Sequence, residues 1–256
     1  MLREKDKELI RKLDLQYPAV ALKFRFEKPD VPHYDGEPLA FCQYIKYTQD
    51  TGKHFYIEAG DDACYGKMIL GMEDKGPVTA SGQAGYDFEC YKLPTGCQQL
   101  YQKLPIIEPH TINYVEYSLA VDCDFDPDIL FFIADFPQSD IIMRATCYIS
   151  GDLWESVSSP VLSCGWMYAR PIITGKPNHI TTGFYHGLKR RKAYPQGLRM
   201  ISIPFQKHPE FFQALEEMPW TVIAFREDEA SKAELQKRVD HWQEMAAAIG
   251  SHVDLK

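Results

Sequence analysis

The sequence lacks the short motifs that mark the commonest enzyme classes. It has no glycine-rich phosphate loop ending in Lys-Ser or Lys-Thr and no GxGxxG dinucleotide fingerprint. It has no HExxH zinc motif and no GxSxG nucleophile elbow. Because CxxC is also missing, neither a zinc ribbon nor a thioredoxin-type motif is predicted. These absences argue against several motif-defined enzyme classes without adding one.

Export and membrane signals are also missing. The first six residues are mostly charged and lead into an amphipathic helix, with no apolar segment behind it. The longest apolar run, residues 129–134, is far shorter than the roughly 20 residues that span a bilayer. We therefore expect a cytoplasmic protein without a membrane partner, in which the seven cysteines stay reduced.

Positive charge is scarce overall but is concentrated in one place. The formal net charge is −8, which disfavours nucleic acid as a partner because phosphates are repelled. Residues 189–192 read Lys-Arg-Arg-Lys and break this pattern. The run is typical of a solvated turn. The less favoured alternative is a site for a phosphate or carboxylate ligand, in which Arg190 and Arg191 would hold the anion.

The pattern of apolar residues predicts an α+β fold. A chain of 256 residues can bury a sizeable core as one domain. Strands are expected at 19–26, 55–57, 113–121, 129–133, 180–185 and 198–203. Helices are expected at 3–13, 39–48, 67–70, 98–104, 139–149, 210–218 and 229–249. Because strands and helices do not alternate regularly, we expect a mixed, largely antiparallel sheet with short flanking helices. The prediction is one domain over residues 1–218, made of two halves packed together, and a helical extension over residues 219–256.

The cysteines are the best candidates for chemistry. Cys64 lies where a helix is expected to begin, with Asp61 or Asp62 as its N-cap, and unpaired backbone N–H groups there favour the thiolate. Cys164 precedes a glycine that allows close backbone approach to a ligand. Cys42 lies on an apolar helix. A buried, inert thiol is the alternative for each of them.

Two further basic residues could serve an anionic substrate. Lys23 shares one face of its predicted strand with Arg25, and this face is either solvent-exposed or the floor of an anion site. Arg170 follows Cys164 by six residues and could bind a carboxylate through two hydrogen bonds, or form an ordinary salt bridge. Among the histidines, His179 and His186 are the best candidates for a ligand or for proton transfer.

Several of these segments together resemble a known family of unknown function, the archaeal conserved region. Each piece is short, and the resemblance rests on their order over residues 9 to about 218. The pieces are residues 18–24, Cys42, residues 63–66, Leu70-Gly71, residues 126–130, residues 163–165, Ala169-Arg170 and residues 200–204.

The resemblance implies the kind of organism in which the protein works, but it implies no reaction. The family is common in anaerobic archaea and bacteria, which suits oxygen-sensitive cofactors. Its cysteine positions correspond to Cys42, Cys64 and Cys164. Cys90, Cys97 and Cys123 do not belong to the family pattern, and residues 219–256 look like an addition, so a fourth ligand and a shared substrate are not implied.

Three functional hypotheses follow, of which the weakest is nucleophilic catalysis by the thiol of Cys64 or Cys164 with a nearby histidine. In the first, Cys42, Cys64 and Cys164 converge on an iron–sulfur cluster or another thiophilic metal such as zinc, with Cys97 or an open position as the fourth ligand. Lys23, Arg170, Arg190 and Arg191 then hold a small anionic substrate for redox or radical chemistry, as in an iron–sulfur oxidoreductase. In the second, the chain is a non-catalytic binding module for a tetrapyrrole or another flat anionic ligand, and its high aromatic content forms the cavity. A homo-oligomer and a redox partner protein are both open.

Overall fold

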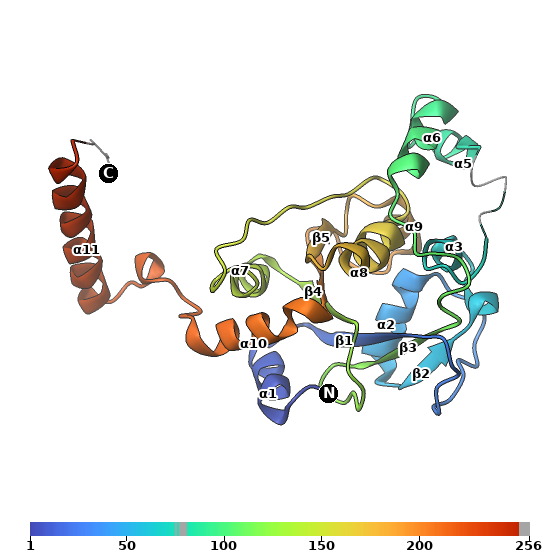
Figure 1. Cartoon of the computed structure of the whole chain (residues 1–256), viewed down its shortest axis with the longest axis horizontal. Helices are drawn as coiled ribbons and strands as arrows, with labels where there is room; N and C mark the ends of the chain where they lie inside the picture. The colour runs from blue at the N-terminus through green and yellow to red at the C-terminus, as the bar shows by residue number, and fades with distance from the viewer. Residues whose placement is uncertain (75, 77–80, 251–256) are drawn as a thin grey trace. The chain divides into compact units, whose positions relative to one another are not determined.

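The fold is built on one open antiparallel sheet of six strands. The computed structural model describes residues 1–74, 76 and 81–250 (Figure 1). The strands are β1 (Tyr17–Arg25), β2 (Phe55–Ile57), β3 (Tyr114–Leu119), β4 (Ile129–Ala134), β5 (Asn178–Thr181) and β6 (Arg199–Pro204). Their order in the sheet is β2-β3-β1-β4-β6-β5, and every pair of neighbouring strands is antiparallel. This α+β architecture confirms the fold class expected from the sequence.

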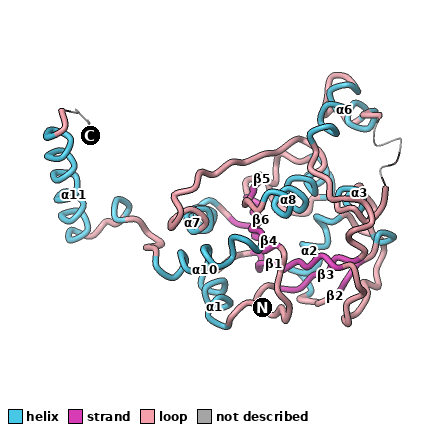
Figure 2. Tube along the Cα trace, viewed as in Figure 1, coloured by secondary structure: helices cyan, strands magenta, loops and turns pink. Residues whose placement is uncertain are grey.

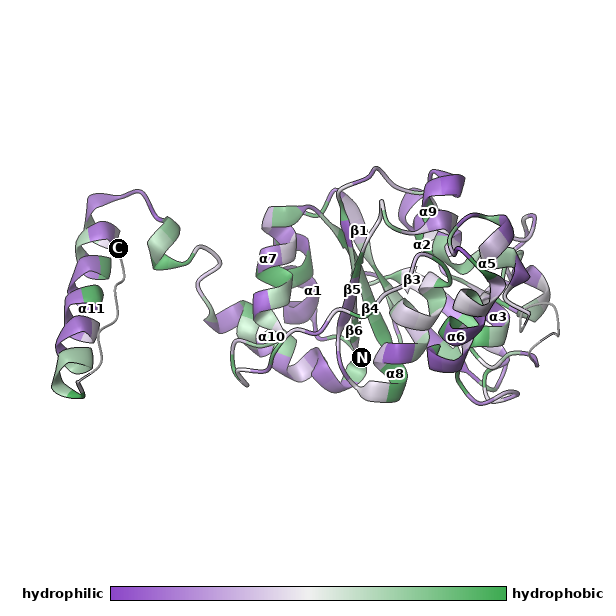
Figure 3. Cartoon of the chain, turned by 90° about the horizontal axis from the view of Figure 1, so that it is seen from above, coloured by the Kyte–Doolittle hydropathy of each residue, from purple (hydrophilic) through white to green (hydrophobic). Residues whose placement is uncertain are grey.

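Helices cover both faces of this sheet (Figure 3). On one side lie α1 (Glu4–Lys12), α7 (Phe136–Ala145) and α10 (His208–Glu217). On the other lie α2 (Phe41–Thr51), α3 (Gly66–Ile69), α8 (Arg170–Thr174) and α9 (His186–Arg191), together with a hairpin of α5 (Gln83–Asp87) and α6 (Pro94–Lys103). A π-helical turn, Gly165–Ala169, leads directly into α8.

At the central strand β4, both faces of the sheet are shielded from solvent. All six of its residues are buried, as expected for a strand with helices on both sides. The ring of Phe131 lies 5.3 Å from that of Tyr168 on one side, and the ring of Phe132 lies 5.7 Å from that of Phe211 on the other. Strand β4 thus contributes side chains to an apolar layer on each face of the sheet, one against the π-helical turn and the other against α10.

Strand β1 differs in one respect from its sequence pattern. The alternation of apolar residues predicts one open face, yet residues 19–22 are all buried because helices cover both faces there. Further along, the two basic residues of the predicted open face are in ion pairs. Lys23 bonds to Asp128 at 2.8 Å, and Arg25 pairs with the buried Glu116.

Several predicted element ends shift for local reasons. The helix expected at 98–104 begins at Pro94, because proline suits the first helical position. The helix expected at 139–149 begins at Phe136, where the Asp135 side chain accepts the backbone N–H of Gln138 at 2.9 Å. The strand expected at 180–185 ends at Thr181.

The chain divides into two compact units, residues 1–216 and residues 217–256. The second contains α11 (Glu229–Ala248), which begins at an Asp228 cap and has no buried residue. Residues 251–256, the end of the predicted extension, lie outside the described residues. Among the described residues, no helix is long and apolar enough to cross a membrane.

Candidate cysteine site and adjoining pocket

Three cysteines from distant parts of the chain line one small cavity. Cys42 is the second residue of α2, Cys64 lies two residues before α3, and Cys164 immediately precedes the π-helical turn. Together with Arg191, the last residue of α9, they surround a cavity of about 40 Å³. The site therefore forms where α2, which packs on β1 and β3, meets the turn that packs on β5 and β6.

Backbone hydrogen bonds hold the three cysteine segments against one another. The Tyr168 hydroxyl donates to the Phe41 carbonyl at 3.1 Å, which ties the segment after Cys164 to the start of α2. The Leu39 N–H donates to the Asp61 carbonyl at 3.1 Å, and the Ala63 N–H donates to the Leu39 carbonyl at 3.0 Å. These bonds bring the residue before Cys64 next to the segment that precedes Cys42.

Gly66 allows a closer approach at the same place. A Cβ atom at this position would lie 2.2 Å from the ring of Phe41, a distance that no real contact allows. The glycine therefore lets α3 lie against the first residue of α2. We attribute the proximity of Cys64 and Cys42 to this contact and to the backbone bonds around Leu39.

Asp62 organises the loop that carries Cys64. Its carboxylate accepts the N–H of Cys64 at 3.1 Å and that of Lys67 at 2.8 Å. The cap residue of α3 is Tyr65, so the sequence prediction of an Asp61 or Asp62 N-cap was wrong in position, although Asp62 does bond to the first turn. Burial raises the pKa of Asp62 to about 6, against the opposing effect of these N–H donors.

The loop before Cys164 contains a strained residue. Leu162 has a φ of 60°, in the left-handed region that is unfavourable for a side chain with a Cβ atom. The Gly165 N–H donates to the Leu162 carbonyl at 3.0 Å and closes the turn around Cys164. Such strain is concentrated at functional sites in proteins, and Leu162 lines the cavity.

Gly165 has a different role from the one expected from its place in the sequence. A Cβ atom there would lie 2.5 Å from Cδ1 of Leu104. The glycine thus admits the side chain of Leu104, which follows α6, instead of a ligand. Close backbone approach was predicted correctly, but the approaching group is part of the protein.

Burial keeps the thiols of Cys42 and Cys164 protonated, while Arg191 opposes this effect. Burial raises the pKa of Cys42 to about 12, and Arg191 lowers it in part. Burial also raises the pKa of Cys164, and Cys42 and Cys64 add to the effect. Although burial lowers the pKa of Arg191, the nearby thiols Cys64 and Cys42 leave it raised. A bound cation would reverse this balance, because a coordinating thiol is deprotonated.

A larger pocket adjoins the cavity and shares part of its wall. It encloses about 410 Å³ and has five lining residues in common with the smaller cavity, Cys64, Tyr65, Leu162, Gly187 and Arg191. Its remaining lining comes from α5 and Phe88 directly after it, from α6 and α9, from Ala63 next to Cys64, and from the loop before Cys164. That loop is part of the long irregular segment between α7 and the π-helical turn (Figure 2).

Aromatic contacts position the charged groups of this larger pocket. The guanidinium carbon of Arg190 lies 5.6 Å from the ring centre of Phe88, and the ring of His186 lies 4.8 Å from it. The His186 Nε2 atom is buried without a hydrogen bond in the described part of the chain. Burial lowers the pKa of His186, and Arg190 and Arg191 lower it further. Its imidazole is therefore neutral near pH 7.

Cys97 lines the larger pocket but not the small cavity. The structure places it inside α6, where the sequence suggested a loop. It is 1% exposed, and burial raises its pKa even though Tyr101 hydrogen-bonds to it. It therefore shares a pocket with Cys64 without joining the group formed by Cys42, Cys64 and Cys164.

Two of the basic residues proposed for an anion lie elsewhere. Lys23 is bonded to Asp128 across β1 and β4, and Arg170 lies 3.5 Å from Glu155. Neither residue lines the cavity or the larger pocket. Arg190 and Arg191 do line the larger pocket, so the structure brings together two of the four predicted basic residues.

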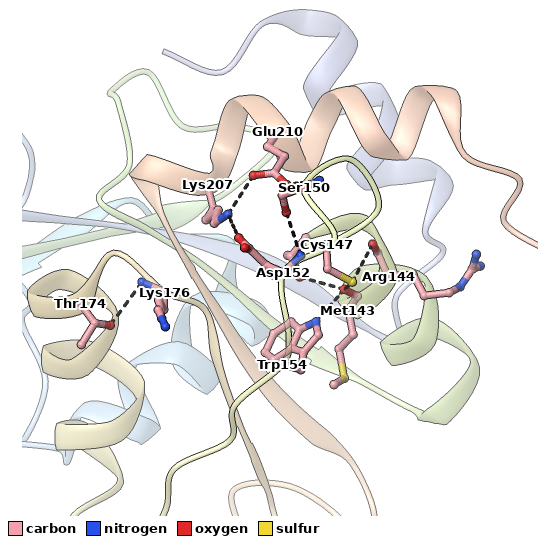
Figure 4. Close-up of polar contacts among 11 residues, drawn as sticks. Met143, Arg144, Cys147, Ser150, Asp152, Trp154, Thr174, Lys176, Lys207 and Glu210 are labelled. Carbon is pink, nitrogen blue, oxygen red and sulfur yellow. Dashed lines mark hydrogen bonds and ion pairs between the residues drawn. The ribbon is translucent and has the colours of Figure 1, made fainter.

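Two other clusters stand apart from the cysteines. His54, Glu116 and Asp124 place one ligand atom each within 4.8 Å of one another, but both oxygens of Glu116 are already engaged by His54 and Arg25. A cavity of about 240 Å³ next to Cys147 contains Lys207, which bonds to Asp152 at 2.7 Å and to Glu210 at 2.9 Å (Figure 4). Because its central cation is neutralised twice, this cavity has little remaining charge for a ligand.

Sequence reasoning missed three residues that shape the site. Tyr168 and Phe88 carry no motif, and their roles depend on contacts between distant segments. Leu162 also gave no signal, because an unusual backbone angle is invisible in a sequence. From the sequence, Asp62 was considered only as a helix cap. Its position two residues before Cys64 could have indicated that it also orients the loop that carries this cysteine.

The comparisons with known proteins identify the family. The family model described as uncharacterised ArCR matches residues 8–214. The chain belongs to this family. An uncharacterised protein of Methanocaldococcus jannaschii, MJ0308, is 22% identical over 220 residues, which are 84% of this chain and 94% of that protein. No solved structure matches the chain significantly. The resemblance seen in the sequence is thus confirmed, and the family brings no assigned reaction with it.

Proposed function

We propose that this ArCR protein binds an iron–sulfur cluster through Cys42, Cys64 and Cys164. The observation that carries the proposal is their meeting, with Arg191, around one cavity although they are 22 and 100 residues apart in the chain. Three thiols and one cation around a shared space form a donor set for a soft metal. A core of inert cysteines would not require a charged side chain among them.

Charge balance supports this donor set. Three thiolates and a core with two positive charges sum to one negative charge. Arg191 supplies one positive charge at the same cavity, and its pKa is raised by the thiols. A buried charge is costly unless it is paired, so this near-neutral sum favours loading of the site.

The spread of the sulfur atoms favours a cluster over a single ion. Within the described residues, the sulfur atoms of Cys42, Cys64 and Cys164 are not all within 4.8 Å of one another. A single tetrahedral zinc ion with bonds of about 2.3 Å would need sulfur atoms about 3.8 Å apart. In a cluster each thiolate binds a different iron atom, so wider spacing suits it. The cluster would occupy the cavity and the adjoining side of the larger pocket.

The chain's own residues would then have distinct tasks. When bound, the cluster supplies one-electron redox chemistry or an open iron position. Arg191 stabilises the thiolates, Asp62 orients the Cys64 loop, and Arg190 attracts a small anionic substrate from solvent. Cys97 faces the same pocket and is the nearest candidate for a fourth ligand by movement of α6. An oxidoreductase role, a redox partner protein and a cytoplasmic setting remain parts of this proposal.

The aromatic residues give less support to a tetrapyrrole-binding module. The rings of Tyr34, Tyr44, Phe55 and Tyr117 pack against one another at 5.0–6.0 Å between centres. They fill the core around α2 and the sheet, and the larger pocket is lined instead by the three separate rings of Tyr65, Phe88 and Tyr101. We keep this alternative as an outcome of the experiment.

The test is anaerobic purification followed by visible absorbance, iron and acid-labile sulfide analysis. We expect broad visible absorbance with matched iron and sulfide, both before and after reconstitution with ferrous iron and sulfide. If the analysis finds zinc and no iron or sulfide, the site binds a single metal ion and not a cluster. A sharp Soret band in the absorbance spectrum would favour a tetrapyrrole. A protein that takes up no iron or sulfide on reconstitution contradicts the proposal.

A further inference from the structure

We propose that the 410 Å³ pocket binds a small carboxylate with a flat, apolar body. Arg190 and Arg191 receive the carboxylate, and Phe88, Val161 and Leu162 surround the body. Because the pocket shares Cys64 and Arg191 with the cavity, this inference deepens the proposed function and rests on it for its catalytic meaning. The binding itself can be measured without any cofactor.

The charge of the pocket is opposite to that of the protein. The chain carries a formal net charge of −8, yet among the residues that the structure describes no Asp or Glu lines this pocket. In the part of the chain that the structure describes, neither Arg190 nor Arg191 forms an ion pair with a carboxylate. Two arginines that face a concave site without an acidic partner are a ready anion site.

The supporting contacts fix the orientation of these cations. The ring of Phe88 contacts both the guanidinium of Arg190 and the ring of His186, which are four residues apart on α9. Gly187 lets Arg191 fold back along α9, since a Cβ atom there would lie 2.8 Å from an Arg191 guanidinium nitrogen. The neutral His186 ring offers a further hydrogen bond through its unpaired Nε2 atom.

The remaining lining favours a carboxylate over a phosphate. In the described lining, the side-chain donors besides the two arginines are Tyr65, Tyr101 and His186, and most other lining residues are apolar, which suits the apolar body of an organic acid better than it suits inorganic phosphate. Phe88, directly after α5, and Val161 and Leu162, in the loop before Cys164, form much of the apolar wall. The volume lies within the range of about 300–1,000 Å³ that is usual for small-molecule sites. A planar acid satisfies both the charged end and the apolar wall.

Calorimetric titration of the full chain with benzoate, cinnamate and hexanoate tests the inference. At least one of these acids should bind at millimolar concentration or below, and Arg190→Gln should weaken that binding by about tenfold or more. Phe88→Leu should weaken it less, because it removes only the support for Arg190. Lys189→Gln is the matched control, since Lys189 belongs to the same basic run but does not line the pocket, and it should stay within about twofold of wild type.

Neutral and phosphate probes distinguish the possible results. Benzamide, the uncharged counterpart of benzoate, should bind much more weakly, and inorganic phosphate should not compete. Failure of all three acids to bind, equal binding of benzamide, or displacement by phosphate would overturn the inference. Titrating both metal-free and reconstituted protein separates the two proposals. Acid binding without iron uptake contradicts only the cluster, and iron uptake without acid binding contradicts only the pocket assignment.

Discussion

The hydroxyl of Tyr168 donates a hydrogen bond of 3.1 Å to the backbone carbonyl of Phe41. Both groups are buried, and the bond joins the π-helical turn to the first residue of α2. Since Cys164 and Cys42 are each within a few residues of this bond, it fixes two of the three cysteine segments relative to each other.

Replacing Tyr168 with Phe should therefore affect stability and the site together. The change leaves the Phe41 carbonyl without this donor in a buried place, which costs about 1–2 kcal/mol of the free energy of unfolding. Urea denaturation of metal-free protein measures the loss. The exposed Tyr148→Phe is a matched control and should change the free energy by less than about 0.5 kcal/mol. Equal stability of Tyr168→Phe and wild type would show that the bond contributes little.

Gly187→Ala should separate the stability of the fold from that of the site. Alanine is favoured over glycine in a helix by about 1 kcal/mol, so the melting temperature should stay the same or rise. The new methyl group, however, meets an Arg191 guanidinium nitrogen and displaces it from the thiols. Reconstituted protein should then lose its iron to a chelator several times faster. Gly60→Ala has open space around its Cβ and serves as the control. Identical rates of iron loss to the chelator for Gly187→Ala and wild type would contradict the proposal that Arg191 stabilises the thiolates.

His208 should make stability fall in mild acid. Burial lowers its pKa from 6.5 to about 4, and its Nε2 bonds to the Ile203 carbonyl at 3.0 Å. Below pH 6.5 the unfolded chain binds a proton that the folded chain refuses until about pH 4, so stability decreases over this window as pH falls. The expected loss is about 3 kcal/mol. Urea denaturation between pH 7 and pH 4 measures it, and His208→Gln should show a loss smaller by that amount. A variant with the same pH dependence as wild type would contradict this assignment.

Lys23→Gln should leave the pocket unaffected. Its ion pair with Asp128 is partly exposed, so its removal should cost about 1 kcal/mol or less in unfolding free energy. Binding of the carboxylate probes and iron content should both match wild type, because Lys23 lines neither the cavity nor the pocket. Loss of probe binding in this variant would show that Lys23 contributes to the anion site.

The sequence predicted the elements of the fold better than their contacts. Alternation and apolar runs located β1, β3, β4 and β6, because burial imposes a period of two or a continuous apolar stretch. The helix starts at Pro94 and Phe136 were missed, and for the second helix the apolar spacing of Ile142, Ala145 and Ile149 drew attention to later residues. The closeness of Cys42, Cys64 and Cys164 was expected from the resemblance, but no spacing encodes it. It depends on Gly66 and Tyr168, whose roles exist only after the segments meet.

The anion site shows the same limit. Lys23 and Arg170 were plausible by residue type, but each has a carboxylate neighbour that the chain supplies from another element. Arg190 and Arg191 stood out only as a charge run, which is usually a solvated surface. Their orientation depends on Phe88 and Gly187, and the sequence marks neither residue as special.

The most direct test of the central claim is to measure iron and sulfide per chain in Cys64→Ser beside Cys147→Ser after identical anaerobic reconstitution. Cys64 lines the cavity, whereas Cys147 lies on the far cavity of Figure 4 and has similar partial exposure. If Cys64 is a ligand of the cluster, Cys147→Ser keeps the iron, sulfide and visible absorbance of wild type, while Cys64→Ser loses most of each. Full retention of iron, sulfide and absorbance in Cys64→Ser would contradict the proposed cluster.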